Sequence, residues 1–211
     1  MKIVVFSDVH GNIEPLQKMI DLEKDTDLFI SLGDIVNYGP YSNECVELIE
    51  ALPNVIKIRG NHEEAFLSGH YNGTHEISNA FFNTVYPSFN KNDAIRDYVQ
   101  DYQAFDFLFV HTIFDQYIYN DSDVLFDQNY MIGHSHRQYL IENGKYQIYN
   151  PGSIGQNRIN IEKGQYLVYY PDSSEVEFKT IDYDFNKLIQ EMKIRKYPSM
   201  CIDYYLSKYK V

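Results

Sequence analysis

Short apolar runs alternate with amphipathic helical patterns in the first half of the chain, and this alternation constrains the fold most strongly. Runs at Ile3–Phe6, Leu28–Leu32 and Val55–Ile58 predict strands because they are short, apolar and rich in β-branched residues. Between them, segments that start near Asn12 and near Ser42–Asn43 carry apolar residues at helical spacing. The resulting β-α-β-α-β order predicts right-handed crossovers and a largely parallel sheet.

The second half of the chain is richer in strands than in helices, which predicts a second sheet packed on the first. Further strands are expected at Phe107–Val110, Tyr130–Ile132, Tyr146–Tyr149, Tyr166–Tyr170 and Val176–Ile181. The segments "ENGK" and "EKGQ" read as hairpin turns, and Thr74–Val85 and Lys91–Tyr102 read as helices. A helical tail is expected from about residue 184, broken at Pro198. No linker is evident, so residues 1–211 are interpreted as a single α/β domain.

Composition narrows the range of functions. The 211 residues are 44% hydrophobic and carry a net charge of −12, with only 18 scattered Lys and Arg, so a long duplex nucleic acid is not expected as a partner. No apolar run is long enough to span a membrane, and the apolar run Ile3–Phe6 is too short for a secretory signal. A cytoplasmic protein is therefore expected, with Cys45 and Cys201 reduced.

Polar side chains follow the predicted strands at the points where five of them end. They are Asp8 with His10, then Asp34, then Asn61 with His62, then His111, and finally His134 with His136. Sites in open α/β sheets form at the carboxyl ends of strands, so these residues are expected to gather there. If the backbone stays extended, residues two apart point the same way, so Asp8 with His10 and His134 with His136 could each form a pair of metal ligands.

The number and type of these residues favour two metal ions. Seven candidate ligands are too many for one tetrahedral zinc ion, whereas two ions can share a bridging carboxylate. Asp, Asn and His without thiolate favour Mn²⁺, Fe or Zn²⁺ over copper or an iron–sulfur cluster.

The motifs "SDVHGN", "LGDIVNYG", "RGNHEE", "FVHT" and "IGHSH" occur in this order. Together they resemble the calcineurin-like metallophosphoesterase superfamily over about Met1 to Arg158, and "NPGSIGQNR" resembles its small bacterial and archaeal phosphodiesterase-like branch. The resemblance implies a four-layer sandwich of two mixed β-sheets flanked by helices. It also implies a dinuclear, metal-dependent phosphoesterase.

Residue roles follow from the resemblance. It implies that Asp8, His10 and His136 hold the first ion, that Asp34 bridges, and that a second ion is held by the remaining ligands, Asn61, His111 and His134. Mn²⁺ suits the centre best, with Fe, Zn²⁺, Ni²⁺ and Mg²⁺ as alternatives. A hydroxide bridging the ions would attack phosphorus. His62 would protonate the leaving oxygen or hold a phosphate oxygen, unless it is only a supporting hydrogen-bond partner.

Two positions depart from protein serine/threonine phosphatases. Asn37 stands where that family has an Asp paired with the catalytic His, and Tyr38 stands where it has a phosphate-binding Arg. Unless Glu63 or Glu64 replaces that Asp, His62 should be less readily protonated. These changes favour a diester over a dianionic monoester. We therefore predict hydrolysis of a phosphodiester of a small nucleotide or short oligonucleotide, with Asn37 in the substrate site.

Several alternatives remain open from the sequence. Arg158 is a candidate substrate-binding cation, as are Arg59 and Arg137, although each could instead form a surface ion pair. His70 and His75 could belong to a lid or to a solvated loop, and the Tyr-rich tail could stack on a base or pack in the core. The competing functions are a phosphomonoesterase or protein phosphatase, and a non-catalytic metal-binding scaffold. A monomer and a homo-oligomer are equally compatible.

Overall fold

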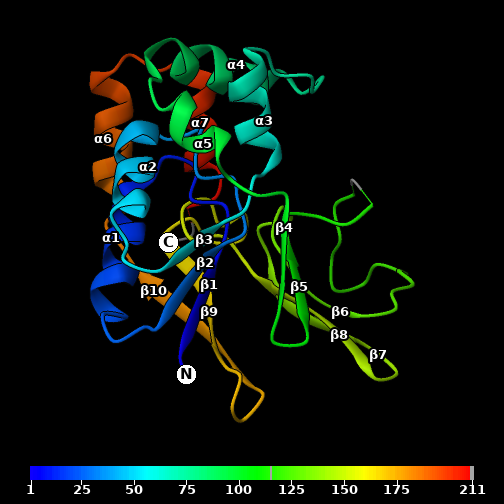
Figure 1. Ribbon diagram of the computed structural model, residues 1–211. Helices are drawn as coiled ribbons and strands as arrows, with labels where there is room; N and C mark the ends of the chain where they lie inside the picture. Colours follow the sequence, from blue (N-terminus) through cyan, green and yellow to red (C-terminus); the bar gives the residue numbers. More distant parts are fainter. Residues whose placement is uncertain (115, 210–211) are drawn as a thin grey trace.

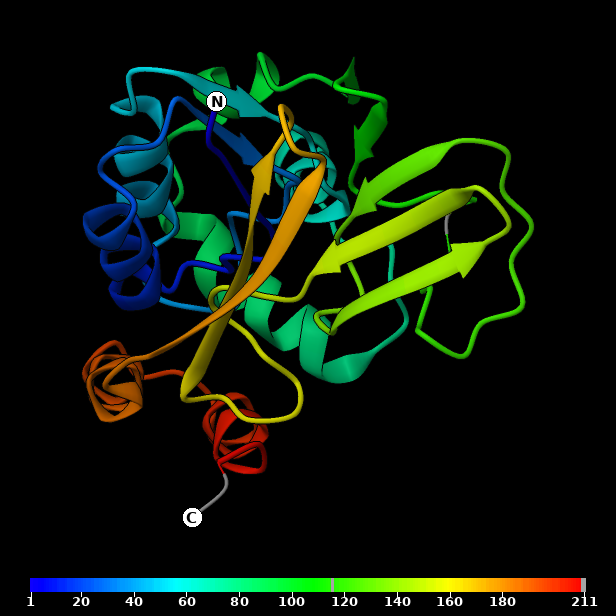
Figure 2. The same cartoon turned by 90° about the horizontal axis from the view of Figure 1, so that it is seen from below.

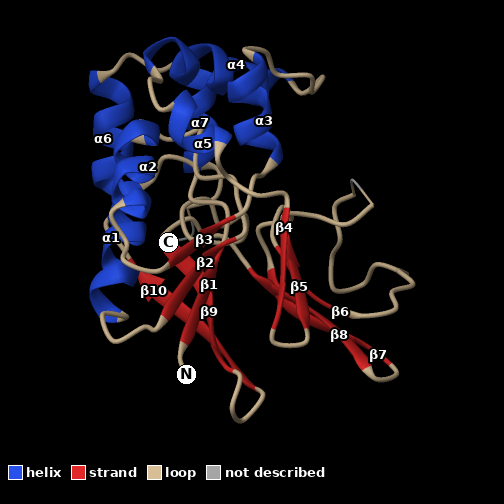
Figure 3. Ribbon diagram, viewed as in Figure 1, coloured by secondary structure: helices blue, strands red, loops and turns tan. Residues whose placement is uncertain are grey.

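Two five-stranded sheets lie at the centre of the computed structural model, which describes residues 1–114 and 116–209 (Figures 1 and 3). The order in the first sheet is β10 (Glu175–Asp182), β9 (Lys163–Tyr170), β1 (Ile3–Phe6), β2 (Leu28–Ser31) and β3 (Val55–Lys57). The order in the second is β4 (Asp101–Ala104), β5 (Phe107–Val110), β6 (Asn129–Ile132), β8 (Tyr146–Pro151) and β7 (Gln138–Asn143). Both sheets are mixed: β1–β2–β3 and β5–β6–β8 pair in parallel, and the remaining pairs are antiparallel.

The helices gather over the first sheet (Figure 1). They are α1 (Ile13–Leu22), α2 (Ser42–Glu50), α3 (Asn61–Ser68), α4 (Glu76–Val85), the 3₁₀ turn Tyr86–Ser88, α5 (Asn92–Arg96), α6 (Phe185–Ile194) and α7 (Ser199–Leu206). Figure 2 shows α6 and α7, in orange and red, on the side away from the second sheet. The outer face of the second sheet packs instead against Ile113, Ile118 and Phe126 of the loop that follows β5.

Alternating side chains explain why the sheets stack. Ile3 and Val5 of β1 face the apolar layer between the sheets, whereas Val4 and Phe6 face the helices. Phe107 and Phe109 of β5 complete the layer between the sheets. The predicted sandwich of two mixed sheets flanked by helices is therefore confirmed. Among the described residues, no helix is long and apolar enough to cross a bilayer.

All eight predicted strands are present, but other local predictions were wrong. The predicted helix Lys91–Tyr102 ends at Arg96, because Asp101–Ala104 pairs with β5 as strand β4. The segment "EKGQ" is not a turn, since β9 begins at Lys163 and the hairpin turn lies between Tyr170 and Glu175. Strand β7 and helix α3 were not predicted, although β7 pairs with β8 in a hairpin that turns at the predicted segment "ENGK".

Candidate metal centre

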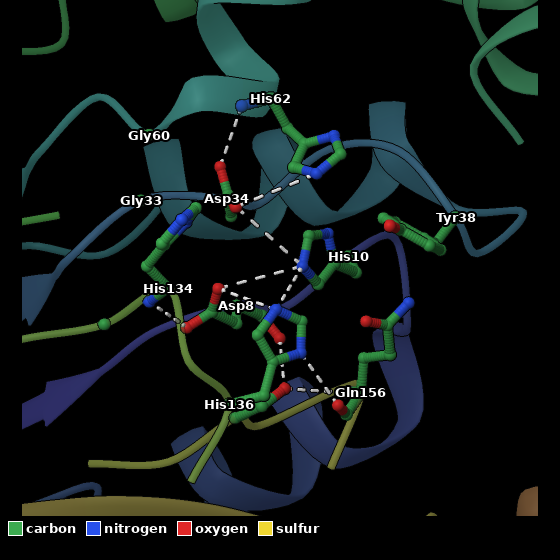
Figure 4. A network of polar contacts seen from close by, with 12 residues as sticks. Asp8, His10, Gly33, Asp34, Tyr38, Gly60, His62, His134, His136 and Gln156 are labelled. Atoms are coloured by element: carbon green, nitrogen blue, oxygen red, sulfur yellow. Dashed lines mark hydrogen bonds and ion pairs between the residues drawn. The ribbon is translucent and has the colours of Figure 1, made fainter. Parts of the chain in front are cut away.

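The loops at the carboxyl ends of five strands bring the predicted ligands together. Figure 4 labels Asp8, His10, Asp34, His134 and His136 among them. Asp8 and His10 follow β1, Asp34 follows β2, and Asn61 is the first residue of α3 after β3. His111 follows β5, and His134 and His136 follow β6. Apart from Asn61 and the partly exposed His134, these ligands are buried.

One group of donor atoms forms around His136. Its Nε2 lies 3.2 Å from Asp8 Oδ1 and 3.2 Å from His10 Nε2. His10 Nε2 is also 3.7 Å from Asp8 Oδ1. Asp8, His10 and His136 therefore present three potential ligand atoms to one small volume.

A second group forms around His111. Its Nε2 lies 3.2 Å from Asp34 Oδ2, 3.1 Å from Asn61 Oδ1 and 3.2 Å from His134 Nδ1. Asp34 Oδ2 is also 3.9 Å from His10 Nε2, so this carboxylate lies between the two groups. The seven residues thus lie in two neighbouring groups, with Asp34 between them, and their assignment as ligands stays a prediction.

These residues fit metal ions because, when ions replace the protons and the histidine rings are neutral, their lone pairs face one another. The Nδ1–H groups of His10, His111 and His136 donate to the backbone carbonyls of Val36, Leu32 and Gln156, respectively. Each Nε2 is then an acceptor, which is how a neighbouring hydrogen bond fixes the tautomer of a ligating His. Asp8 Oδ1 is buried with no hydrogen-bond partner. Acceptors this close together call for cations between them.

The electrostatics of the ion-free cluster lead to the same conclusion. Burial raises the pKa of Asp8 to about 7, against the charge of His111. Burial also acts to raise the pKa of Asp34, but His111 and His62 hold it well below its usual value. The pKa of His111 rises to about 10 because Asp34 outweighs the effect of burial. Asp34 is therefore an anion that attracts positive charge at the middle of the cluster.

Glu63 holds the bridging loop in place, and sequence reasoning missed this role. Its carboxylate accepts the N–H groups of Asp34 at 2.8 Å, Ile35 at 2.7 Å, Val36 at 3.2 Å and Gly60 at 2.8 Å. Neither Glu63 nor Glu64 replaces the missing Asp beside His62, because Glu63 binds these backbone groups. Glu64 contacts Arg59 and Gln100. The position of Glu63 as third residue of α3 after Gly60 is a capping-box signal that could have indicated this contact.

His62 lies at the edge of the cluster with its ring held by Asn37. Asn37 Nδ2 donates to His62 Nδ1 across 2.9 Å, so the ring carries its proton on Nε2. That Nε2 is 3.9 Å from Asp34 Oδ2 and faces the cluster (Figure 4). Burial lowers the pKa of His62, although the Asp34 carboxylate opposes this. His62 is therefore placed as a neutral N–H donor beside the ligands.

The three candidate arginines have different surroundings. Arg59 donates to the carbonyls of Arg96 and Tyr98 and pairs with Glu64, so its guanidinium is already engaged in contacts within the protein. Arg137 lies over the Tyr119 ring. Arg158 is partly buried, its Nε has no hydrogen-bond partner, and its guanidinium lies 5.3 Å from the Tyr117 ring centroid.

The prediction of ligand pairs two residues apart is confirmed for Asp8 with His10, which share a group, but was wrong for His134 with His136, and neither pair has the extended backbone that was assumed. Asp8, His10, Asp34, His134 and His136 all have φ between 48° and 67°, in the left-handed region. Such backbone is uncommon for residues with a Cβ and is concentrated at functional sites. His134 and His136 point to different groups and do not form one pair of ligands.

Sequence reasoning also missed the aromatic rings around the cluster. Tyr117 stacks on His134 with ring centroids 4.0 Å apart, and Tyr71 stacks on His62 at 5.5 Å. No periodicity marks either tyrosine, since both lie in loops. His70 is exposed, and His75 precedes α4 and lines a cavity beside the cluster.

Comparison with known proteins identifies the family. The model of the calcineurin-like phosphoesterase superfamily domain matches residues 1–173. The chain belongs to this superfamily. The phosphoesterase domain model thus covers all seven predicted ligands, His62 and Arg158. Membership supports a metal-dependent phosphoester hydrolase, and the cluster supplies candidate ligands for divalent ions.

Relatives of this calcineurin-like chain match it over nearly its full length. The uncharacterized protein MJ0912 of Methanocaldococcus jannaschii is 28% identical over 93% of each sequence. The crystal structure of a metallophosphoesterase from Sphaerobacter thermophilus has a TM-score of 0.82 at 23% identity and covers 99% of each chain. An archaeal phosphodiesterase has a TM-score of 0.52 at 18% identity and covers 86% of this chain and all of its own. The two structures share the fold.

Proposed function

We propose that this protein hydrolyses a phosphodiester of a small nucleotide or short oligonucleotide with two divalent ions, of which Mn²⁺ suits the ligands best. The observation that carries the proposal is the position of Asp34, whose Oδ2 lies 3.2 Å from His111 Nε2 and 3.9 Å from His10 Nε2. One carboxylate shared by two ligand sets is the arrangement that a pair of ions requires.

When bound, the two ions would supply a water-derived nucleophile and offset charge that develops on the phosphoryl oxygens. The chain positions the other participants. The backbone N–H of His62 donates to Asp34 Oδ1 at 2.9 Å, which leaves Oδ2 to face the cluster. His62 Nε2–H can donate to a phosphoryl or leaving oxygen, because Asn37 holds the ring from its Nδ1 side. Arg158 can pair with a non-bridging phosphate oxygen.

The surroundings of His62 favour a diester over a monoester. A carboxylate at position 37 would favour an imidazolium, whereas the amide of Asn37 only donates to the neutral ring. Tyr38 provides no cation, and its hydroxyl is engaged with Ser78 Oγ at 3.0 Å. A diester carries one negative charge and needs fewer cationic contacts than a dianionic monoester. The archaeal phosphodiesterase that shares the fold is consistent with this choice.

The test compares bis(p-nitrophenyl) phosphate with p-nitrophenyl phosphate on protein loaded with Mn²⁺. We expect about two ions per chain by elemental analysis and a higher kcat/KM for the diester. His62→Ala should keep the ions and lose turnover, whereas His70→Ala, an exposed histidine, should keep both. Faster hydrolysis of the monoester would overturn the diester assignment, and a folded protein that binds no divalent ion would overturn the whole proposal.

A further inference from the structure

A cavity of about 400 Å³ lies beside the metal centre, and tyrosines from four separate segments line it. Tyr38 comes from the loop after β2, Tyr71 from the segment after α3, Tyr117 from the loop after β5, and Tyr204 from α7. Among the described residues that line it, Arg158 is the only Lys or Arg. The tyrosines are far apart in sequence, so only the fold brings them to one cavity.

Ring contacts connect the cavity directly to the cluster. Tyr117 stacks on His134 at 4.0 Å with an interplanar angle of 19°, and Tyr71 stacks on His62 at 5.5 Å and 21°. Tyr38 meets the His10 ring edge-to-face at 4.7 Å. A group that occupies this cavity would therefore adjoin a phosphate at the metal centre.

The described lining of the cavity carries a cation and no carboxylate, although the protein is acidic. The chain has 30 Asp and Glu, yet none of the ten described residues that line the cavity is acidic. Among the described residues, no carboxylate pairs with Arg158. Lys208 Nζ lies 3.4 Å from the Tyr204 ring centroid, and burial together with Arg158 lowers the pKa of Lys208 to about 8. The lining thus favours an anionic ligand.

Support behind the tyrosines keeps their rings in place. Tyr204 packs edge-to-face on Phe81 at 5.8 Å, and Tyr38 packs on Phe81 at 4.6 Å. The Tyr38 hydroxyl is paired with Ser78 Oγ. Tyr71 and Tyr204 are only partly buried, so parts of their surfaces are available to a ligand.

We propose that this cavity binds the nucleobase of a nucleoside phosphate, with the base against the tyrosine rings and Arg158 on the phosphate beside the metal centre. The inference rests on the proposed function, because it assigns the substrate group that adjoins the scissile phosphate. Bases stack on aromatic side chains, and each stacked base contributes strongly to binding. A purely aliphatic substituent would gain no stacking, and an ammonium group would meet Arg158.

The test measures binding without turnover. Two probes are titrated calorimetrically into Mn²⁺-loaded protein: methylphosphonate, and the AMP analogue in which a methylene group replaces the 5′ ester oxygen. We expect the nucleoside probe to bind at least about tenfold more tightly. Tyr204→Leu and Tyr71→Leu should each remove most of this preference and change methylphosphonate affinity less than about twofold. Tyr146→Leu, on β8 and outside the cavity, should retain the preference.

Equal affinity for the two probes would overturn the inference, as would a preference that survives in both cavity variants. Thermal melts identify a variant that fails to fold, and Tyr204→Phe should keep the preference because it keeps the ring. The outcome is separable from the proposed function. Ester hydrolysis without base-dependent binding would refute only the proposal that the cavity binds a nucleobase. Base-dependent binding without hydrolysis of any ester would refute only the proposed hydrolase activity.

Discussion

Asn37 Nδ2 lies 2.9 Å from His62 Nδ1 and fixes the imidazole on the side away from the ligand cluster. Both side chains are buried, so water cannot readily replace the contact. Asn37 itself has φ of 73°, which places its amide against the ring from a strained turn after β2. The relationship makes Asn37 a positioning residue for His62.

Replacing Asn37 should separate turnover from metal binding. Asn37→Ala leaves the His62 ring without its partner, so kcat on a diester should fall about 10- to 100-fold. Metal content should stay unchanged, because no ligand atom is removed. Asn54→Ala removes a surface amide remote from the site and is the control. Loss of the ions together with activity would show that Asn37 instead supports the whole cluster.

The bridging position predicts a severe effect at Asp34. Asp34→Asn keeps the shape but removes the charge that both ligand groups share, so activity should fall by roughly 10³ or more. Metal affinity measured by equilibrium dialysis should fall with it. Asp182→Asn on β10 removes an equally charged but exposed group and should leave both quantities unchanged. An Asp34→Asn protein with normal metal affinity would contradict the bridging role.

A variant at His134 should distinguish the two ion sites. His134 belongs only to the group with Asp34 and His111, so His134→Ala should lower the stoichiometry from about two ions per chain to about one. The group of Asp8, His10 and His136 keeps all its ligands. Titration with Mn²⁺, followed by elemental analysis after desalting, measures the change. Loss of both ions at once would mean that the two groups of ligands bind their ions only together.

Arg158 should weaken the fold while supporting substrate binding. Arg158 is partly buried, its Nε has no hydrogen-bond partner, and no carboxylate among the described residues pairs with it; such a guanidinium is costly, so Arg158→Met should raise the melting temperature. The same change should raise KM about 10- to 100-fold, because a charged hydrogen bond to phosphate is lost. Arg137→Met, at a cation–π contact with Tyr119, is the matched control. A variant with unchanged KM would exclude Arg158 from the substrate site.

Gly33 should tolerate no side chain. Its φ is +100°, and a Cβ at this position would lie 2.5 Å from the backbone nitrogen of Gly60. Gly33→Ala should therefore cost about 1–3 kcal/mol of stability and also weaken metal binding, because Asp34 and Asn61 follow the two glycines. Chemical denaturation and Mn²⁺ titration measure the two effects. Gly144→Ala is the comparison variant. Its φ is also positive, at +62°, but the added Cβ meets nothing within 4 Å, so it tests backbone strain without a steric clash.

The sequence by itself determined the strands and the type of site. Runs such as Ile3–Phe6 and Phe107–Val110 form strands as predicted. Their side chains point alternately to the two faces of the sheet, and both faces pack against apolar residues. The residues that follow them carry metal-binding side chains in an order that identified the family. Those signals are local, so they can be read without knowing which segments meet.

Only the tertiary structure decided how these segments combine. The sequence predicts that Asp101–Ala104 belongs to the end of a helix. In the structure this segment is a strand, because Tyr102 pairs opposite Phe109 of β5. His134 and His136 are two residues apart, yet they lie in different ligand groups. Tyr71, Tyr117 and Tyr204 meet at one cavity only because loops and α7 converge over the metal centre. These histidine and tyrosine contacts join segments that are far apart in the chain, so they leave no periodic trace in the sequence.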